Sequence, residues 1–229
     1  MCGRVIVQSG KVVNWYKKKY GDDPESTVED NANICPTDSL SVITNKEPRK
    51  LQFFRWGLIP SSTRDLSNLP LMFNARAETL LEKTSFRNLV KSKRCIVIVT
   101  GWYEWGGKPK QQYVFNIKDR EELIFAGLWD EWYNQETGKT IKSVSIITVA
   151  SNDLVAQYHE KERQPAILAI DNEVDEWLAD GRKDEEYIDM LKIFPSDEME
   201  VKPVGEPKPD KAPKPSKPEK PKPPSLFDF

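Results

Sequence analysis

The run Cys95-Ile96-Val97-Ile98-Val99-Thr100 and its continuation Gly101-Trp102-Tyr103-Glu104-Trp105 decide the fold. A short, unbroken run of apolar β-branched residues predicts a fully buried strand. Glu104 follows this run among three aromatic residues, which would desolvate its carboxyl group and raise its pKa. Such a carboxyl suits a general acid near neutral pH, whereas the alternative is an ordinary exposed acid at a strand end.

Shorter strand-like and helix-like segments flank this run on both sides. The pattern predicts strands over 3–8, 41–44, 51–56, 112–117, 123–128, 143–149 and 167–170. It predicts helices over 11–20, 84–92, 151–158, 171–178 and 184–192. Because strands and helices do not alternate regularly, we expect one α+β domain over residues 1–204. Its core should be a mainly antiparallel, barrel-like β-sheet with peripheral helices.

The composition changes abruptly at about residue 205. Nine of the 17 prolines follow residue 200 and alternate with lysine, which predicts a disordered, extended tail over 205–229. The tail ends in three large apolar side chains, Leu226, Phe227 and Phe229. These residues are hard to explain as a solvated linker and indicate a docking peptide. The alternative is a C-terminus that folds back onto its own domain.

Charge and residue usage exclude several functional classes. Residues 201–229 carry seven lysines against four acidic residues, whereas the preceding 200 carry 27 basic and 32 acidic side chains. Net charge therefore gives no support for nucleic-acid binding, which would need a local concentration of basic groups. Three widely spaced cysteines and one histidine predict neither a disulfide framework nor a metal site, and no cofactor is expected.

Cys2 directly follows Met1, and its small side chain permits methionine aminopeptidase to remove Met1. Cys2 would then carry a free α-amine and a thiol on adjacent carbons. An amine and a thiol placed in this way condense with an aldehyde to a five-membered thiazolidine. The alternative is that Cys2 is only a small, buried apolar residue.

Three further segments have an unusual composition for a plain core: Trp56-Gly57-Leu58-Ile59-Pro60, Phe73-Asn74-Ala75-Arg76-Ala77-Glu78-Thr79, and Tyr158-His159. Each also has an ordinary structural explanation. The tryptophans would fill core, Arg76 would pair with Glu78, and His159 would be a structural histidine.

Together these segments resemble one family, the SRAP (SOS-response-associated peptidase) proteins, over about residues 2–200. The resemblance is carried by six ordered motifs: Cys2-Gly3-Arg4, Asn33-Ile34-Cys35-Pro36-Thr37, Trp56 to Pro60, Asn74 to Glu78, Gly101 to Trp105, and His159 with Arg163 and Pro165. The segment from His159 to Pro165 is two residues longer than the usual family pattern.

The resemblance implies a protein that crosslinks to abasic sites in single-stranded DNA. It implies Cys2 as the nucleophile, Asn74 as the residue that positions the N-terminus, and Glu104 and His159 as proton-transfer groups. Two sets of DNA contacts follow from it: phosphate contacts by Arg4 and Arg76, and base contacts by Trp56 and Trp105. Leu226-Phe227 resembles the bacterial sliding-clamp-binding peptide, and Asp228-Phe229 resembles the tail of single-stranded-DNA-binding protein.

We therefore expect a bacterial or phage protein that forms a thiazolidine crosslink through processed Cys2 and protects the lesion during replication. It should be a cytoplasmic monomer at replication forks, without a membrane segment. Two alternatives stay open. One is a thiol peptidase or autopeptidase that uses Cys2, and the other is a non-catalytic module that binds lesions in single-stranded DNA.

Overall fold

The segment over residues 95–105 runs through two β-sheets, with one strand in each. The computed structural model describes residues 2–106, 110–159, 161–169 and 171–205. Strand β6 (Arg94–Val99) belongs to the first sheet and strand β7 (Gly101–Gly106) to the second. All six residues of β6 are buried, which confirms the expected buried strand.

Five strands of the first sheet close into a barrel. Their order is β10 (Thr140–Ala150), β4 (Glu47–Trp56), β3 (Ser39–Thr44), β6 and β9 (Leu123–Tyr133), and β9 pairs again with β10. The β4–β10 pair is parallel and the other four pairs are antiparallel. Strands β5 (Asn74–Arg76) and β11 (Arg163–Pro165) also pair with β10. The expected α+β fold with a mainly antiparallel barrel is confirmed.

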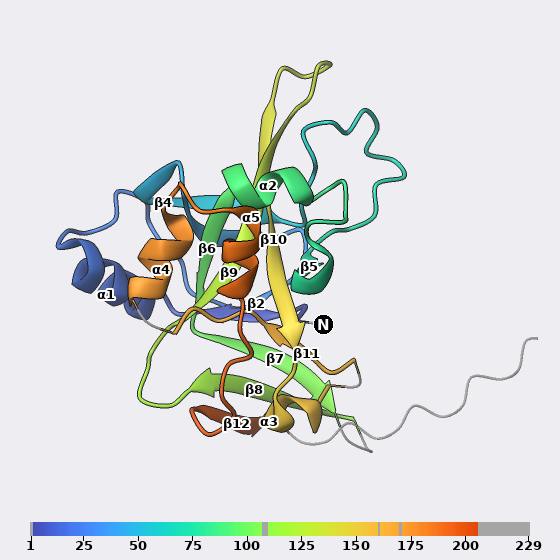
Figure 1. The fold of residues 1–229 in the computed structure, drawn as a ribbon. Helices are drawn as coiled ribbons and strands as arrows, with labels where there is room; N and C mark the ends of the chain where they lie inside the picture. Colours follow the sequence, from blue (N-terminus) through green and yellow to red (C-terminus); the bar gives the residue numbers. More distant parts are fainter. Residues whose placement is uncertain (1, 107–109, 160, 170, 206–229) are drawn as a thin grey trace, which may run out of the picture.

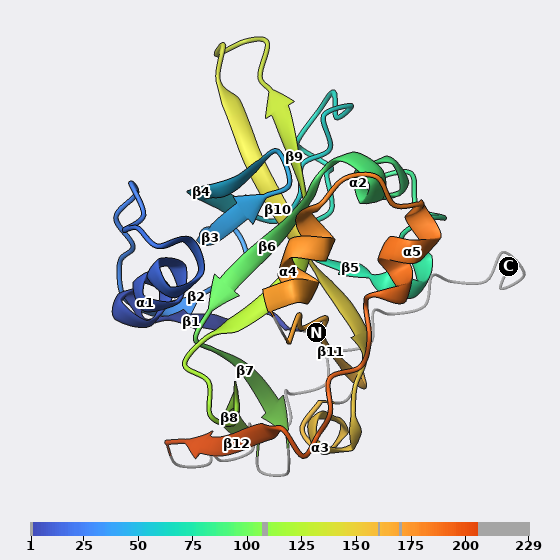
Figure 2. The same cartoon turned by 60° about the vertical axis from the view of Figure 1, so that its left-hand side comes forward.

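The second sheet is antiparallel throughout and lies beneath the barrel in Figure 2. Its order is β12 (Met199–Val204), β8 (Gln111–Ile117), β7, β1 (Val5–Val7) and β2 (Asn31–Ile34). Thr100 lies where the chain passes between the sheets. The Thr100 N–H donates to the Ile6 carbonyl at 2.8 Å, and the Thr100 carbonyl accepts a hydrogen bond from the Asn116 side-chain amide at 2.7 Å. The N-terminal strand is therefore fixed at the junction of the two sheets.

The described part of the chain has five α-helices. They lie at the periphery (Figure 1). They are α1 (Ser9–Tyr20), α2 (Arg87–Ser92), α3 (Asp153–Ala156), α4 (Asp171–Leu178) and α5 (Asp184–Asp189). The prediction of a strand over 167–170 is wrong. Ile167 makes only an isolated bridge to Phe125, and the strand of this region is the earlier β11. Within the described residues, no helix is long and apolar enough to cross a membrane.

The tail predicted over 205–229 begins at the end of the described region, where Gly205 is the last described residue. The docking peptide at Leu226, Phe227 and Phe229 lies outside the described residues and stays a prediction.

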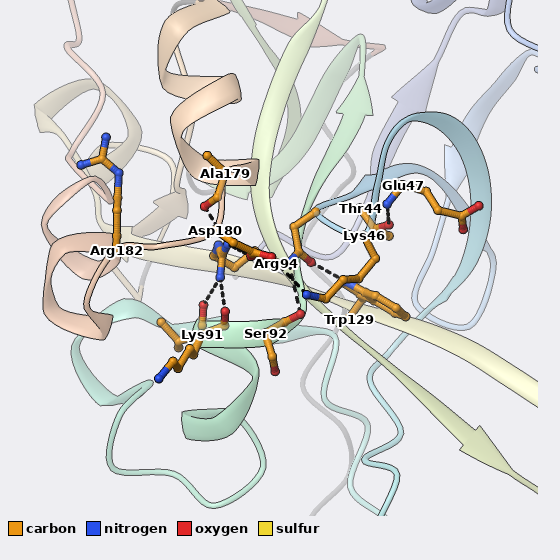
Figure 3. Close-up of polar contacts among 12 residues, drawn as sticks. Thr44, Lys46, Glu47, Lys91, Ser92, Arg94, Trp129, Ala179, Asp180 and Arg182 are labelled. Atoms are coloured by element: carbon orange, nitrogen blue, oxygen red, sulfur yellow. Dashed lines mark hydrogen bonds and ion pairs between the residues drawn. The ribbon is translucent and has the colours of Figure 1, made fainter.

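Arg94, the first residue of β6, holds two helices against the barrel (Figure 3). Arg94 is fully buried, and its guanidinium lies 3.8 Å from the centre of the Tyr187 ring. Figure 3 shows Arg94 beside Lys91, Ala179 and Asp180. Arg94 donates hydrogen bonds to four backbone carbonyls at the ends of α2 and α4, those of Val90, Lys91, Trp177 and Ala179. It also donates to the Asp180 carboxylate at 2.8 Å. One buried cation thus satisfies acceptors that the helix ends leave open.

Replacing Arg94 by methionine should lower the free energy of unfolding by about 3 kcal/mol or more, because buried carbonyls lose their donors. Urea denaturation measures this change. Lys46→Met is the matched control, since Lys46 pairs with the same Asp180 at 3.2 Å while both side chains are more than half exposed. That control should cost less than about 1 kcal/mol. Equal effects of the two substitutions would contradict this role of Arg94.

Candidate active site

Cys2 lies buried just before strand β1 of the second sheet. Strand β1 pairs on one side with β2 and on the other with β7, and Val5 faces both Ile34 and Trp102. Cys2 is 1% exposed. Its carbonyl accepts a hydrogen bond of 2.7 Å from the side-chain amide of Asn74, the first residue of β5. The structure therefore brings together Cys2 and Asn74, which are 72 residues apart in the sequence.

Glu104 lies on β7 and points to the interior side of the second sheet. Side chains alternate along a strand, so Glu104 shares a face with fully buried Trp102. Glu104 is 3% exposed, and burial raises the pKa of its carboxyl to about 7. The Oε1 atom has no hydrogen-bond partner among the described residues. Burial and, second, the charge of Glu104 raise the pKa of the Cys2 thiol well above its usual value.

His159 is the fourth side chain of this group and joins it through its contact with Glu104. Its Nε2 lies 3.5 Å from Oε2 of Glu104, and its Nδ1 accepts the backbone N–H of Arg163 at 3.3 Å. Because Nδ1 is an acceptor, the neutral ring carries its proton on Nε2, which faces the carboxyl. A Cβ on Gly106 would lie 2.7 Å from the Tyr158 Cα, so glycine permits this close approach of the 158–159 segment to β7.

The longer spacing between His159 and Pro165 is absorbed in a turn. The N–H of Glu162 donates to the His159 carbonyl at 2.9 Å, and Glu162 has a positive φ of 48°. After this turn β11 pairs with β10, with Gln164 opposite Val149. The two extra residues therefore do not prevent His159 from reaching Glu104.

Arg4 and Trp105 lie on the opposite face of the second sheet from Glu104. The Arg4 guanidinium is 5.0 Å from the centre of the Trp105 ring, and Trp105 is 6.3 Å from the ring of Tyr103. The three side chains are partly buried. They form an aromatic surface that carries a positive charge, which is the combination that single-stranded nucleic acid favours.

Two arginines, Arg76 and Arg163, lie near the Asn74 segment. Arg76, at the end of β5, is exposed. Glu78 pairs with Arg163, through two bonds of 2.7 and 2.9 Å, and not with Arg76 as the structural alternative for this segment had it. Arg163 also donates to the Thr148 carbonyl at 2.6 Å. Sequence reasoning named Arg163 only as part of a motif and missed that it joins the His159 turn to the Asn74 segment.

The structure does not support the prediction that Trp56 contacts DNA bases. Its side chain is fully buried, and its indole N–H donates to the Phe73 carbonyl at 2.8 Å. Trp56 therefore belongs to the core behind the site. Among the described residues, no group of three or more His, Cys, Asp or Glu side chains is arranged to hold a metal ion.

The barrel, the second sheet and the Cys2–Asn74–Glu104–His159 group define a class of protein. The family model described as "SOS response associated peptidase (SRAP)" matches residues 1–207, so the chain belongs to this family. The abasic site processing protein YoqW of Bacillus subtilis (strain 168) is 36% identical over 182 residues, which are 77% of this chain and 80% of that protein.

Two further comparisons agree with this assignment. The abasic site processing protein HMCES of Gallus gallus is 28% identical over 187 residues, covering 71% of this chain and 54% of that protein. A crystal structure of a protein from Bacteroides thetaiotaomicron matches with a TM-score of 0.81 and 30% identity, covering 89% of this chain and 92% of that one. The likeness therefore extends over most of the described fold.

The raised pKa of Glu104 predicts a pH-dependent cost to stability. The folded state keeps a proton that the unfolded state releases between about pH 4.5 and 7, so Glu104 destabilises the fold progressively as the pH rises through this window. Glu104→Gln should be more stable than the wild type by up to about 3 kcal/mol at pH 8, with the gain shrinking towards pH 4.5. Urea denaturation across this range measures the difference.

The exposed Glu121→Gln is the control and should show no such trend. A Glu104→Gln difference that is the same at pH 5 and pH 8 would contradict the assignment of the raised pKa to this carboxyl.

Proposed function

We propose that this chain, once Met1 is removed, forms a covalent thiazolidine with the aldehyde of an abasic site in single-stranded DNA. The observation that carries the proposal is the position of Cys2, held by Asn74 and adjacent to a buried carboxyl whose pKa is about 7. The names of YoqW and HMCES as abasic site processing proteins support the same substrate.

The first half of the reaction forms a Schiff base. The neutral α-amine of Cys2 attacks C1′ of the ring-opened sugar, and the resulting carbinolamine must lose its hydroxyl as water. Protonated Glu104 supplies the proton for this departure, leaving an iminium ion and a carboxylate. A carboxyl with a pKa of about 7 is protonated in an appreciable fraction of molecules near neutral pH, as this step requires.

The second half closes the ring. The Glu104 carboxylate takes the proton of the Cys2 thiol while the sulfur attacks the iminium carbon. The products are a thiazolidine and one water, and Glu104 is again protonated. One carboxyl thus acts first as an acid and then as a base. His159, 3.5 Å from it, would exchange this proton and act on a sugar hydroxyl or the 3′ phosphate.

The residues proposed to contact the DNA are Arg4, Trp105 and Arg76. Guanidinium groups suit phosphate oxygens, and an indole ring suits an unstacked base. The first 200 residues are acidic overall, so binding depends on these few local groups and should weaken with salt. The covalent bond shields the lesion from strand cleavage while the DNA is replicated.

A thiol peptidase is the competing proposal, and the family description carries that word. A peptidase of this kind needs a thiolate, whereas burial and the nearby Glu104 charge disfavour ionisation of Cys2. In the crosslinking reaction the thiol can stay protonated until the iminium carbon is in place. The site therefore favours crosslinking, and turnover of a peptide without DNA would favour the alternative.

Incubation with single-stranded DNA that carries one abasic site should give an adduct that survives denaturation. Cys2→Ala should abolish it, since both the thiol and the ring closure are lost, whereas Cys35→Ala should leave it unchanged. Denaturing gels measure both outcomes. Retention of the DNA only under native conditions would support a binding module instead and would contradict covalent chemistry.

The rate of crosslinking should have a bell-shaped pH profile. The rate rises with pH as the α-amine, which has a reference pKa of about 7.7–8, loses its proton. The rate falls above about pH 7 because the Glu104 carboxyl loses the proton that it must donate. Glu104→Gln should slow the reaction by roughly 100-fold and remove the falling limb. Single-turnover rates between pH 5 and 9 test this, with Glu121→Gln as control. An unchanged profile in Glu104→Gln would refute the role of Glu104.

A further inference from the structure

Two of the sequence motifs have no part in the chemistry above: Trp56 to Pro60 and Asn33 to Thr37. We propose that Trp56 is a positioning residue for the reaction. Its indole N–H fixes the backbone at Phe73 and, through it, the Asn74 side chain that holds Cys2. The expected effect of Trp56 on the crosslinking rate rests on the proposed function. The effect of Trp56 on the position of Asn74 can be tested without DNA.

Trp56 and Asn74 follow one another along the same edge of β10. Strand β4 pairs with β10 only at Ser143 and Val144, where Val144 faces Trp56. At Gly57, with a φ of 125°, the chain leaves this edge. Strand β5 then takes its place, with Ile146 facing Asn74. The last residue of β4 and the first residue of β5 are thus two positions apart along β10.

The indole bridges the break between these two strands. The Phe73 carbonyl accepts two hydrogen bonds, one from Trp56 Nε1 at 2.8 Å and one from the Ile146 N–H at 3.1 Å. The Trp56 and Phe73 rings also pack edge to face at 6.0 Å. Since the next residue is Asn74, these contacts set the point from which its side chain reaches Cys2.

Asn74 depends on this support because its own amide is weakly held. Its Nδ2 donates to the Cys2 carbonyl, but its buried Oδ1 has no partner among the described residues. The amide therefore cannot be oriented by a network of side chains. Its position follows from the backbone of β5, and Trp56 holds that backbone just before Asn74.

The Asn33 to Thr37 motif fixes Trp56 in turn. The Thr37 N–H donates to the Trp56 carbonyl at 2.8 Å, and the Trp56 N–H donates to the Asp38 carbonyl at 2.7 Å. Thr37 adopts a φ of 90°, which is unfavourable for a β-branched residue and is kept here by these bonds. The same turn follows β2, which pairs with β1, so it supports both Trp56 and the strand that follows Cys2.

The direct test is Trp56→Phe, which keeps an aromatic ring and removes the N–H donor. We expect crosslinking to slow by about tenfold, within the range that small misplacements produce in oriented reactions. Trp177→Phe is the matched control. Trp177, which lies on α4, is also fully buried. Its indole N–H donates to the backbone carbonyl of Cys95 on β6 at 2.9 Å and not to a residue of the site. Its crosslinking rate should stay within about twofold of the wild type.

A double-substitution cycle separates positioning from general destabilisation. If Trp56 acts through Asn74, then adding Trp56→Phe to Asn74→Ala should cause no further loss of rate. An equal loss in both backgrounds would overturn the proposal, as would an unchanged rate in Trp56→Phe alone. If Trp56→Phe does not fold, replacement of Trp56 by 3-benzothienylalanine keeps the shape of the indole while sulfur replaces the N–H.

A measurement without DNA keeps this inference distinct from the proposed function. The side-chain amide signals of Asn74 in a ¹⁵N spectrum, identified by their loss in Asn74→Ala, should shift or broaden in Trp56→Phe and stay in place in Trp177→Phe. Unchanged Asn74 signals would overturn the positioning role, even if the wild-type chain crosslinks DNA. A wild-type chain that forms no adduct would refute the proposed function alone.

Discussion

The backbone from Arg94 to Gly106 passes from one sheet into the other, and this continuous connection fixes how the two sheets lie relative to each other. Its first half is a barrel strand and its second half lies in the lower sheet, with Thr100 bonded to β1 at the crossing. The N-terminal strand therefore has one place to pair. That pairing brings Cys2 near Glu104, while the barrel brings Asn74 to Cys2 along β10. Neither sheet alone would assemble the site.

Burial gives this site its chemistry. An exposed glutamate would be ionised at neutral pH and could not donate a proton to a departing hydroxyl. Between aromatic residues and with one oxygen unpaired, Glu104 has a pKa of about 7 and can serve both steps of the proposed reaction. The fold carries a stability cost for this arrangement, because the same carboxyl would be better solvated in the unfolded chain.

Sequence reasoning was strongest where a local pattern decides the structure. The 95–100 run predicted β6, and the aromatic neighbours of Glu104 predicted its raised pKa. It was weakest where contacts between segments that are distant in the sequence determine the structure. Trp56 was expected to face DNA, because a tryptophan before a turn gives no local sign of whether it is buried. Short strands such as β2 and β5 carry little pattern of their own, and their existence depends on pairing with β1 and β10.

The central claim is that the Cys2 amine and thiol both bond to the abasic sugar. The intact mass of the adduct tests this most directly, after nuclease digestion, denaturation and alkylation of free thiols. The account predicts a chain without Met1 that carries the sugar-phosphate fragment less one water. Of its three cysteines, only Cys35 and Cys95 should be alkylated. An adduct that retains Met1, or one with all three cysteines alkylated, would contradict it.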